Sequence, residues 1–244
     1  MRHAGFVTRI PEPLDPPLDP MAFAESLGEV GKRRYHSLHR FHDRMNAGAL
    51  SRQDLKTWAT NRYYYQRCIP LKDAAILSNC PDREVRRRWI KRIVDHDGSA
   101  SDPGGIEAWL RLCHAVGATR EEVESEKLVV PGVRFAVDAY VTLARTRPWL
   151  EAIASSLTEL FAPVLMAKRI AAFEQHYPWV DAEGLAYFRS RVTLAKADSD
   201  YALALVLERC ATRSEQERCI AALETKCDIL WVQLDAIDLA CTGA

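Results

Sequence analysis

The chain has 244 residues, of which 48% are hydrophobic and 27% are charged, and its formal net charge is zero. This balance argues against nucleic acid or a membrane surface as the main partner. Because no apolar run approaches the roughly 20 residues of a membrane span and no signal-peptide core is present, we expect a cytoplasmic protein.

The sequence predicts a short arm followed by one domain. Residues 1–20 hold five of the twelve prolines and should form an extended arm, because neither a helix nor an inner strand tolerates that density. Residues 21–244 show no internal repeat and no change of composition, so we expect a single domain there. Asp19 and Pro20 are typical of an N-cap and a first helical position, so a short helix should follow.

Three histidines come next at steps of three: His36, which follows Tyr35, then His39 and His42. The simpler interpretation is a half-exposed helix whose imidazoles make local hydrogen bonds. The alternative, in which one of them faces a ligand, stays open at this point.

The most informative stretch is a predicted helix over residues 51–79, which begins with a capping box at Ser51 and should bend near Pro70. A cation, a phenol, an amide and an aliphatic side chain fall on one face of it. This composition differs from an ordinary core stripe and predicts the wall of a polar pocket inside a helical protein. The four residues stand at positions i, i+3, i+4 and i+7: Arg62, Tyr65, Gln66 and Ile69.

A second helix should begin at Pro81 and end before Gly98. Arg92 and His96 stand four residues apart beside Trp89, on the side expected to face inward. The helix dipole favours the imidazolium form of His96 in the last turn, whereas Arg92 opposes it. The protonation state of His96 therefore stays open.

Further helices are predicted from Gly104, Thr119, Pro131 and Pro148, near Asp181, and over about 213–240. The helix from Pro148 is expected to be long and unbroken. No segment shows sustained period-two alternation. We therefore predict an all-α fold, a compact single-domain bundle of about seven to eight helices.

Lys226 interrupts the apolar stripe of the last predicted helix, between Leu223 and Leu230. A buried ammonium without a partner costs several kcal/mol. Snorkelling, or pairing with a structural carboxylate, is one interpretation. A contact with an anion in the pocket is the other, and the sequence does not decide between them.

Five strings are long and unusual in composition: NRYYYQRCIPLKDAAILSNC (Asn61 to Cys80), DHDGSASDPGGIEAWLRL (Asp95 to Leu112), PGVRFAVDAY (Pro131 to Tyr140), SSLTELFAP (Ser155 to Pro163), and His176 to Arg191. They resemble the pyrroloquinoline-quinone synthase (PqqC) family, and the similarity covers residues 21 to 241. The resemblance implies a haem-oxygenase-like fold shared with the thiaminase-like TenA proteins. It also implies a homodimer and a catalytic domain over 21–244.

The activity implied by the resemblance is the final step of pyrroloquinoline quinone (PQQ) biosynthesis. In that step a bicyclic tricarboxylic precursor (AHQQ) undergoes ring closure and an eight-electron oxidation by O₂, with release of H₂O₂. The family is a cofactor-independent oxidoreductase, with no metal or organic cofactor. Some relatives are fused to the peptide-carrier protein PqqD, so a fusion to PqqD or an interaction with it is expected.

The same resemblance implies roles for individual residues. His96 would shuttle protons, while Tyr187 and Arg191 would steady oxygen and its reduced forms, so these three are the predicted catalytic residues. Guanidinium groups suit carboxylate binding because the planar group donates two parallel hydrogen bonds to one carboxylate. The predicted substrate-binding residues are Tyr35, His36, Arg62, Gln66, Arg92, Tyr140, Glu159, Arg169 and Lys226.

One position departs from the family pattern. Met166 stands where relatives carry a histidine, and a thioether does not exchange protons. Either that histidine is replaceable or another group, such as His36, covers its role. Met166 is therefore left out of the predicted catalytic set.

Parts of the sequence are also compatible with other functions. The seven cysteines form no Cys-x-x-Cys pair and predict neither a zinc site nor a disulfide framework, so most should be small buried residues. Cys68 and Cys80 are the candidate nucleophiles of a TenA-like hydrolase. His42-Asp43 and His96-Asp97 suggest a metal-dependent His-Asp phosphohydrolase, although further ligands are not specified. A non-catalytic binder or carrier of the precursor is the remaining alternative.

Overall fold

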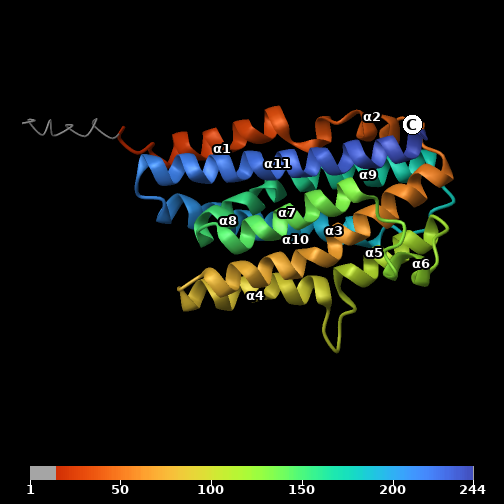
Figure 1. The fold of residues 1–244 in the computed structure, drawn as a ribbon, viewed down its shortest axis with the longest axis horizontal. Helices are drawn as coiled ribbons and strands as arrows, with labels where there is room; N and C mark the ends of the chain where they lie inside the picture. The colour runs from red at the N-terminus through yellow and green to blue at the C-terminus, as the bar shows by residue number, and fades with distance from the viewer. Residues whose placement is uncertain (1–14, 244) are drawn as a thin grey trace, which may run out of the picture.

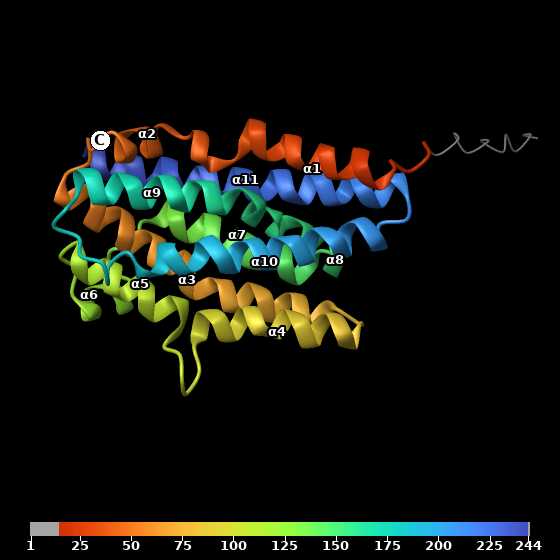
Figure 2. The same cartoon turned by 180° about the vertical axis from the view of Figure 1, so that it is seen from behind.

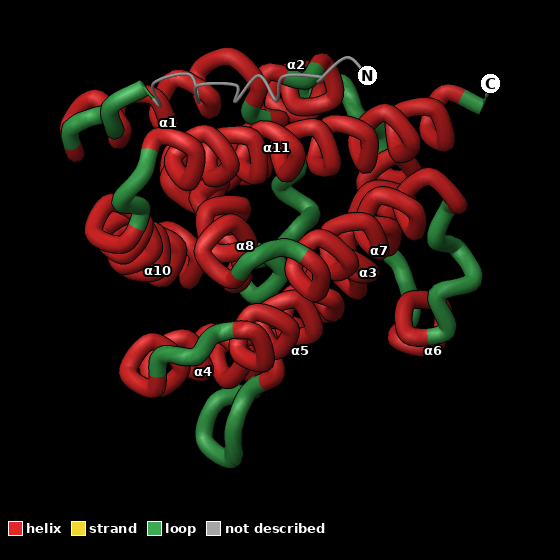
Figure 3. The backbone as a smooth tube through the Cα atoms, turned by 60° about the vertical axis from the view of Figure 1, so that its left-hand side comes forward, coloured by secondary structure: helices red, strands yellow, loops and turns green. Residues whose placement is uncertain are grey.

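The computed structural model describes residues 15–243, and within them every regular element is a helix (Figure 1, Figure 3). The all-α prediction is confirmed, although the helices outnumber the seven or eight predicted. Most of the proline-rich arm, residues 1–14, lies outside the described residues. The elements are α1 (Pro20–Arg34), η1 (His36–Leu38), α2 (Arg40–Asn46), α3 (Arg52–Asn79), α4 (Arg83–Asp97), α5 (Gly104–Ala115), α6 (Arg120–Glu124), α7 (Pro131–Thr146), α8 (Trp149–Ser155), η2 (Ser156–Phe161), α9 (Ala162–His176), α10 (Ala186–Arg209) and α11 (Arg213–Thr242).

Local capping explains where several helices begin. Asp19 caps α1 by accepting from the amides of Met21 and Ala22, and Pro20 occupies the first helical position. The predicted capping box at Ser51 is present at the start of α3, and that helix runs unbroken through Pro70. These starts confirm the predictions made from the sequence.

The prediction of one unbroken helix from Pro148 is wrong. The chain forms α8, then the 3₁₀ segment η2, then α9. Two local features explain the break. The hydroxyl of Ser155 donates to the carbonyl of Ala152 at 2.6 Å and so competes with the helical pattern. Pro163, which has no N–H to donate, then suits the first turn of a new helix.

This interrupted stretch, Trp149–His176, is also long and apolar enough to cross a membrane by composition alone. Its most apolar 18-residue window has a mean hydropathy of 1.4, in contrast to the expectation that no such run exists. Of that window, 56% is buried inside the bundle. A core segment of a helical bundle shows the same pattern, so composition alone is weak evidence for a membrane span.

The long helices lie roughly side by side, with α3 near the middle of the bundle (Figure 1, Figure 2). Helix α3 packs against α4, α5 and α7, and α11 packs against α1, α7 and α8. Helix α10 packs against α9, seen in front in Figure 2. The loop between α4 and α5 projects away from the bundle (Figure 1).

The apolar core has two main parts with a polar region between them. In α3, Leu55 and Trp58 belong to one part and Ile76 to the other. In α11, Leu234 belongs to the first part and Leu223 to the second. The side chains between these positions in α3, α10 and α11 surround the candidate site described below. The core is thus built around a polar centre.

Gly104, at the start of α5, holds the α4–α5 loop close to the end of α4. Its φ is +80°, and a Cβ there would lie 2.5 Å from the amide nitrogen of Gly98 and 2.6 Å from the carbonyl oxygen of His96. We expect Gly104→Ala to lower the free energy of unfolding by about 1–3 kcal/mol, because both the backbone conformation and the space exclude a side chain. Urea denaturation measures this change.

Gly28 provides the matched control. It lies in α1, and a Cβ there would meet nothing within 4 Å. Gly28→Ala should leave stability unchanged or raise it by about 0.5–1 kcal/mol, since alanine favours the helix. Equal denaturation midpoints for the two variants would show that the loop adapts to a side chain at Gly104.

Candidate active site

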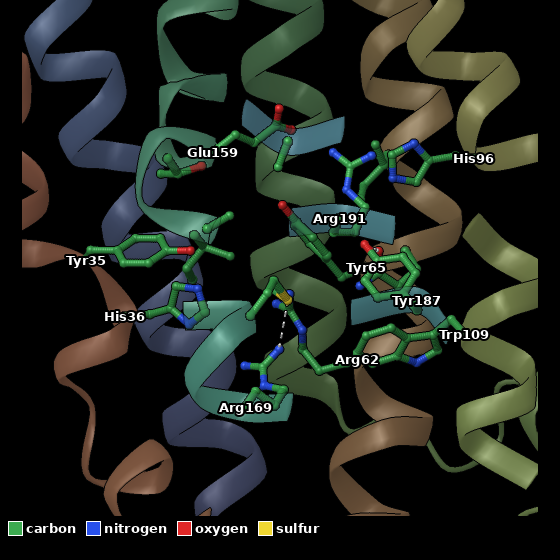
Figure 4. A pocket seen from close by; sticks show the side chains of 17 residues that line it. Tyr35, His36, Arg62, Tyr65, His96, Trp109, Glu159, Arg169, Tyr187 and Arg191 are labelled. Atoms are coloured by element: carbon green, nitrogen blue, oxygen red, sulfur yellow. Dashed lines mark hydrogen bonds between the residues drawn. The ribbon is translucent and has the colours of Figure 1, made fainter. Parts of the chain in front are cut away.

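A cavity lies between the two parts of the core, with about 580 Å³ of empty space including its opening to solvent (Figure 4). Side chains from η1, α3, α4, α5, η2, α9, α10 and α11 line it, together with Tyr35. The lining residues are Tyr35, His36, Arg62, Tyr65, Gln66, Ile69, His96, Trp109, Thr158, Glu159, Ala162, Met166, Arg169, Tyr187, Arg191, Ala195 and Leu230.

The predicted polar face of α3 forms one wall of this cavity. All four members of that face belong to the lining, as expected from their i, i+3, i+4 and i+7 spacing. The guanidinium of Arg62 lies over the ring of Tyr65, 4.2 Å from its centroid. The amide oxygen of Gln66 accepts a 2.7 Å hydrogen bond from the hydroxyl of Tyr187. The helix therefore presents a cation, a phenol and an amide together.

His96 reaches the cavity from the last turn of α4. Its Nδ1 lies 3.0 Å from the carbonyl oxygen of Arg92, so Nδ1 carries the proton and Nε2 is left with a lone pair. Nε2 is buried and has no hydrogen-bond partner. Burial and the nearby charge of Arg191 lower the pKa of His96 to about 4. The imidazole is therefore neutral and has an unused basic nitrogen.

Three guanidinium groups face the same cavity (Figure 4). Arg62 donates to the side-chain oxygen of Gln233 at 2.7 Å and makes no ion pair with the described residues. Burial, reinforced by the charge of Arg62, lowers the pKa of Arg169 to about 9, and its Nε has no partner. Arg191 lies 3.6 Å from a carboxylate oxygen of Asp198. The cavity therefore holds more positive charge than its surroundings neutralise.

Arg92 was predicted to bind substrate but does not line the cavity. Its guanidinium forms a two-point contact with Glu159, at 2.9 and 2.5 Å, and lies 3.3 Å from Asp73 and 3.1 Å from Asp198. Burial opposes the charged form of Arg92, but these carboxylates outweigh it and hold its pKa well above the ordinary value. Glu159 does line the cavity, and Arg92 holds its pKa down to about 2 despite burial. In this structure Arg92 orients Glu159.

Lys226 and Tyr140 also lie behind the lining. Lys226 is completely buried, and among the described residues no carboxylate forms an ion pair with it, so the interpretation as a snorkelling or paired lysine is wrong. Its Nζ donates to the hydroxyl of Tyr65 at 3.0 Å and lies 3.4 Å from the ring centroid of Tyr140. Burial and the charges of Arg62 and Lys72 hold the pKa of Lys226 well below its ordinary value. Lys226 therefore does not line the cavity itself but donates a hydrogen bond to Tyr65, which does.

The three spaced histidines are buried, so their interpretation as a half-exposed helix face is wrong. His36 lies in η1 and lines the cavity beside Tyr35. His42 lies behind it in α2. His39 caps α2 and contacts Asp235 at 3.0 Å. Only His36 of the three reaches the site.

Sequence reasoning missed part of the lining. Trp109 of α5 packs edge-on against Tyr187, with ring centroids 4.9 Å apart. Burial raises the pKa of Tyr187, so its hydroxyl stays protonated. Trp109 lies on a strongly amphipathic helix and was indistinguishable from an ordinary core tryptophan, as were Ala162, Ala195 and Leu230. No local signal marks these residues as lining a cavity.

A model of the TENA/THI-4/PQQC family matches residues 25–236 of the chain. The chain belongs to this family. Among curated relatives, the pyrroloquinoline-quinone synthases of Pseudomonas aeruginosa PAO1 and Acinetobacter baylyi are 54% and 52% identical to it. These similarities cover 91% of this chain in both cases, and 89% and 86% of the relatives. The predicted resemblance is confirmed, and with it the prediction of an enzyme of the synthase type with a role in PQQ biosynthesis.

Two crystal structures share the fold of this family member at low sequence identity. A TenA homologue from Pseudomonas syringae has a TM-score of 0.72 and 14% identity, and the match covers 89% of this chain and 93% of that one. A domain of unknown function with a haem-oxygenase-like fold, from Shewanella denitrificans, has a TM-score of 0.75 and 13% identity, with coverage of 93% and 97%. The predicted haem-oxygenase-like fold is confirmed.

Met166, the residue predicted to stand in place of a family histidine, lines the cavity. Its sulfur lies 3.8 Å from Nη1 of Arg169, the contact drawn as a dashed line in Figure 4. A thioether accepts only weakly. Nη1 of Arg169 is therefore left without a strong acceptor, while Nη2 contacts His42.

The buried histidines predict how stability depends on pH. Burial and neighbouring charges lower the pKa values of His36, His42 and His96 below those of an unfolded chain. Between about pH 6.5 and 4 the unfolded chain therefore binds more protons, and the free energy of unfolding falls as pH falls. At pH 5, the lowered pKa of His96 alone should make the free energy of unfolding about 2 kcal/mol smaller than at neutral pH.

Urea denaturation between pH 8 and 5 tests this expectation, with His96→Gln as the comparison. The variant should lose less stability over that range than the wild type. If the free energy of unfolding changed with pH by the same amount in both proteins, His96 would not be a neutral, buried imidazole.

Proposed function

We propose that the chain catalyses the last step of pyrroloquinoline quinone biosynthesis, with ring closure and eight-electron oxidation of the bicyclic tricarboxylic precursor by O₂ and release of H₂O₂. The names of its relatives support the pathway. The chemistry of the cavity supports the substrate class and the kind of step. The residues that line the cavity come from eight different elements, so the site depends on the intact bundle.

One observation carries the proposal: two buried guanidinium groups, Arg62 and Arg169, face one cavity and make no carboxylate ion pair with the described residues. An uncompensated buried charge is strongly destabilising. A tricarboxylate would supply the missing negative charge through short, charge-assisted hydrogen bonds. The site is therefore complementary to a polyanion.

His96 is the proposed base. Its free Nε2 points into the cavity, where a bound carbon acid or amine could give up a proton (Figure 4). The pKa of about 4, set by the protein groups alone, makes it a weak base. Negative charge on the substrate would offset the arginines and raise that pKa toward neutrality. Substrate binding would thus activate the base.

Removal of a proton makes the precursor more electron-rich, so that it can pass electrons to O₂ without a metal or organic cofactor. Tyr187 and Arg191 would steady the reduced forms of oxygen, because a protonated phenol and a guanidinium both donate hydrogen bonds to an anion. Their side chains line the cavity on one face of α10. The absence of a cofactor stays a prediction.

A hydrolase with a cysteine nucleophile fits the cavity less well. No lining residue is a cysteine, and six of the seven cysteines are buried, as predicted. Burial raises the pKa of Cys68 to about 11, which disfavours the thiolate. The metal-dependent alternative is also weakened: His42 and His96 are buried whereas Asp43 and Asp97 are exposed, so neither pair presents two ligands to one ion.

The decisive experiment is incubation of the purified protein with the bicyclic precursor in air. Quinone absorbance and H₂O₂ should both rise, and neither a chelator nor a thiol-alkylating reagent should prevent this. Loss of activity after alkylation, or a requirement for a stoichiometric metal, would support the rival functions. Oxygen uptake by the bound precursor, absent from a non-catalytic carrier, separates an enzyme from a carrier. The homodimer, the link to PqqD and the cytoplasmic location stay predictions.

A further inference from the structure

His42 lies behind the cavity wall, yet its imidazole contacts two residues of the lining. Its Nε2 is 3.1 Å from Nδ1 of His36, and its Nδ1 is 3.5 Å from Nη2 of Arg169. His36 is 5% exposed and His42 is 1% exposed, so water does not compete for these contacts. Hydrogen bonds thus link the three side chains in the order Arg169, His42, His36. The two outer members, His36 and Arg169, lie at the cavity, as Figure 4 shows.

The guanidinium of Arg169 determines which nitrogen donates and which accepts in these hydrogen bonds. Arginine has N–H donors and no acceptor, so Nδ1 of His42 must accept and carries no proton. A neutral imidazole holds one proton, which His42 therefore carries on Nε2 and donates to Nδ1 of His36. His36 must then hold its own proton on Nε2. Burial, together with nearby positive groups, keeps the pKa of both rings well below the ordinary value, in agreement with two neutral imidazoles.

We propose that His42 is a positioning residue that fixes the tautomer of His36, so that His36 presents Nε2–H to an anionic oxygen of the ligand. The opposite tautomer would present a lone pair to that oxygen and repel it. The identity of the ligand rests on the proposed function, whereas the tautomer follows from the contacts alone. His36 thereby adds a neutral donor to a site otherwise dominated by guanidinium groups.

Nitrogen-15 NMR of histidine-labelled protein tests the tautomer directly. In the ligand-free wild type, Nδ1 of His36 should have the chemical shift of an unprotonated nitrogen and Nε2 that of a protonated one. His42→Phe removes the donor to His36 and should give a mixture of tautomers. The spectrum of the His36→Gln variant lacks the two nitrogen resonances of His36 and so identifies them in the wild type.

Binding of PQQ itself, the proposed product and a tricarboxylate, tests the consequence. His42→Phe should weaken the affinity about tenfold, the effect of one misdirected hydrogen bond to a charged group. His42→Gln, whose amide N–H can replace Nε2–H, should restore affinity to within about threefold, whereas His42→Asn, which is too short, should resemble His42→Phe. A defect shared equally by the Gln and Asn variants would assign His42 a packing role and overturn the proposal.

His39→Asn is the matched control, because asparagine keeps an N-cap acceptor for α2 and His39 does not contact the cavity lining through its ring. It should change neither the tautomer of His36 nor PQQ affinity. A wild-type His36 protonated on Nδ1 would overturn the proposal. Failure of the wild type to oxidise the precursor, with tautomer and PQQ affinity as expected, would refute only the proposed reaction.

Discussion

His96→Ala should still bind the tricarboxylic precursor but lower turnover by about 10²–10⁴-fold, the usual contribution of a positioned base. The reason is that His96 presents the unpartnered Nε2 to the cavity, while Arg62 and Arg169 supply the charge that binds carboxylates. Single-turnover measurements of quinone absorbance, together with the dissociation constant of the precursor under anaerobic conditions, separate the two effects.

His114→Gln is a suitable control, since His114 lies exposed on α5 away from the lining. It should leave both quantities unchanged. If His96→Ala lost affinity and turnover in equal proportion, His96 would be a binding residue and another group would have to act as the base.

Lys226→Met should weaken the affinity for PQQ about tenfold, because the hydroxyl of Tyr65, which lines the cavity, loses the hydrogen bond that positions it. It should also leave the ligand-free protein as stable as the wild type or more stable by about 1–4 kcal/mol. The sign follows from burial: the folded state holds the pKa of Lys226 well below that of an unfolded lysine, so folding at neutral pH is opposed by this group. Titration with PQQ and urea denaturation measure the two changes.

Lys72 is the matched comparison, because it is also buried but has a carboxylate partner. Its Nζ lies 2.5 Å from Asp73, and Asp73 is completely buried. Lys72→Met should destabilise the fold by roughly 3–5 kcal/mol, since it leaves part of a buried charge without its partner. Equal destabilisation by the two substitutions would show that Lys226 has a structural role rather than a ligand-binding one.

Features fixed by neighbouring residues were the most predictable. The helix starts at Asp19 and Ser51 follow from side chains that cap the next few amides. The polar wall of α3 follows from helical spacing, because residues three and four apart share a face whatever surrounds the helix. The same spacing indicated correctly that Arg92 and His96 turn inward, and both are 2% exposed.

Features that depend on distant partners were not predictable. The ion pair between Arg92 and Glu159 joins residues 67 positions apart in the sequence. Glu159 also belongs to a 3₁₀ segment that was expected to be α-helical. The pairing of His36 with His42 depends on the extended backbone of His39, which separates η1 from α2, rather than on helical spacing. The position of Tyr140 behind the lining likewise depends on how α7 meets α11. Helical periodicity gives the direction of a side chain but not the group that it meets.

The division of the apolar core into two parts has a consequence for cooperativity. The helices α3, α10 and α11 cross from one part to the other through a region where like charges oppose one another. An anion bound there would cancel that repulsion and join the two halves into one unfolding unit. Amide hydrogen exchange in the middle turns of these three helices should therefore slow on ligand binding far more than exchange at their ends.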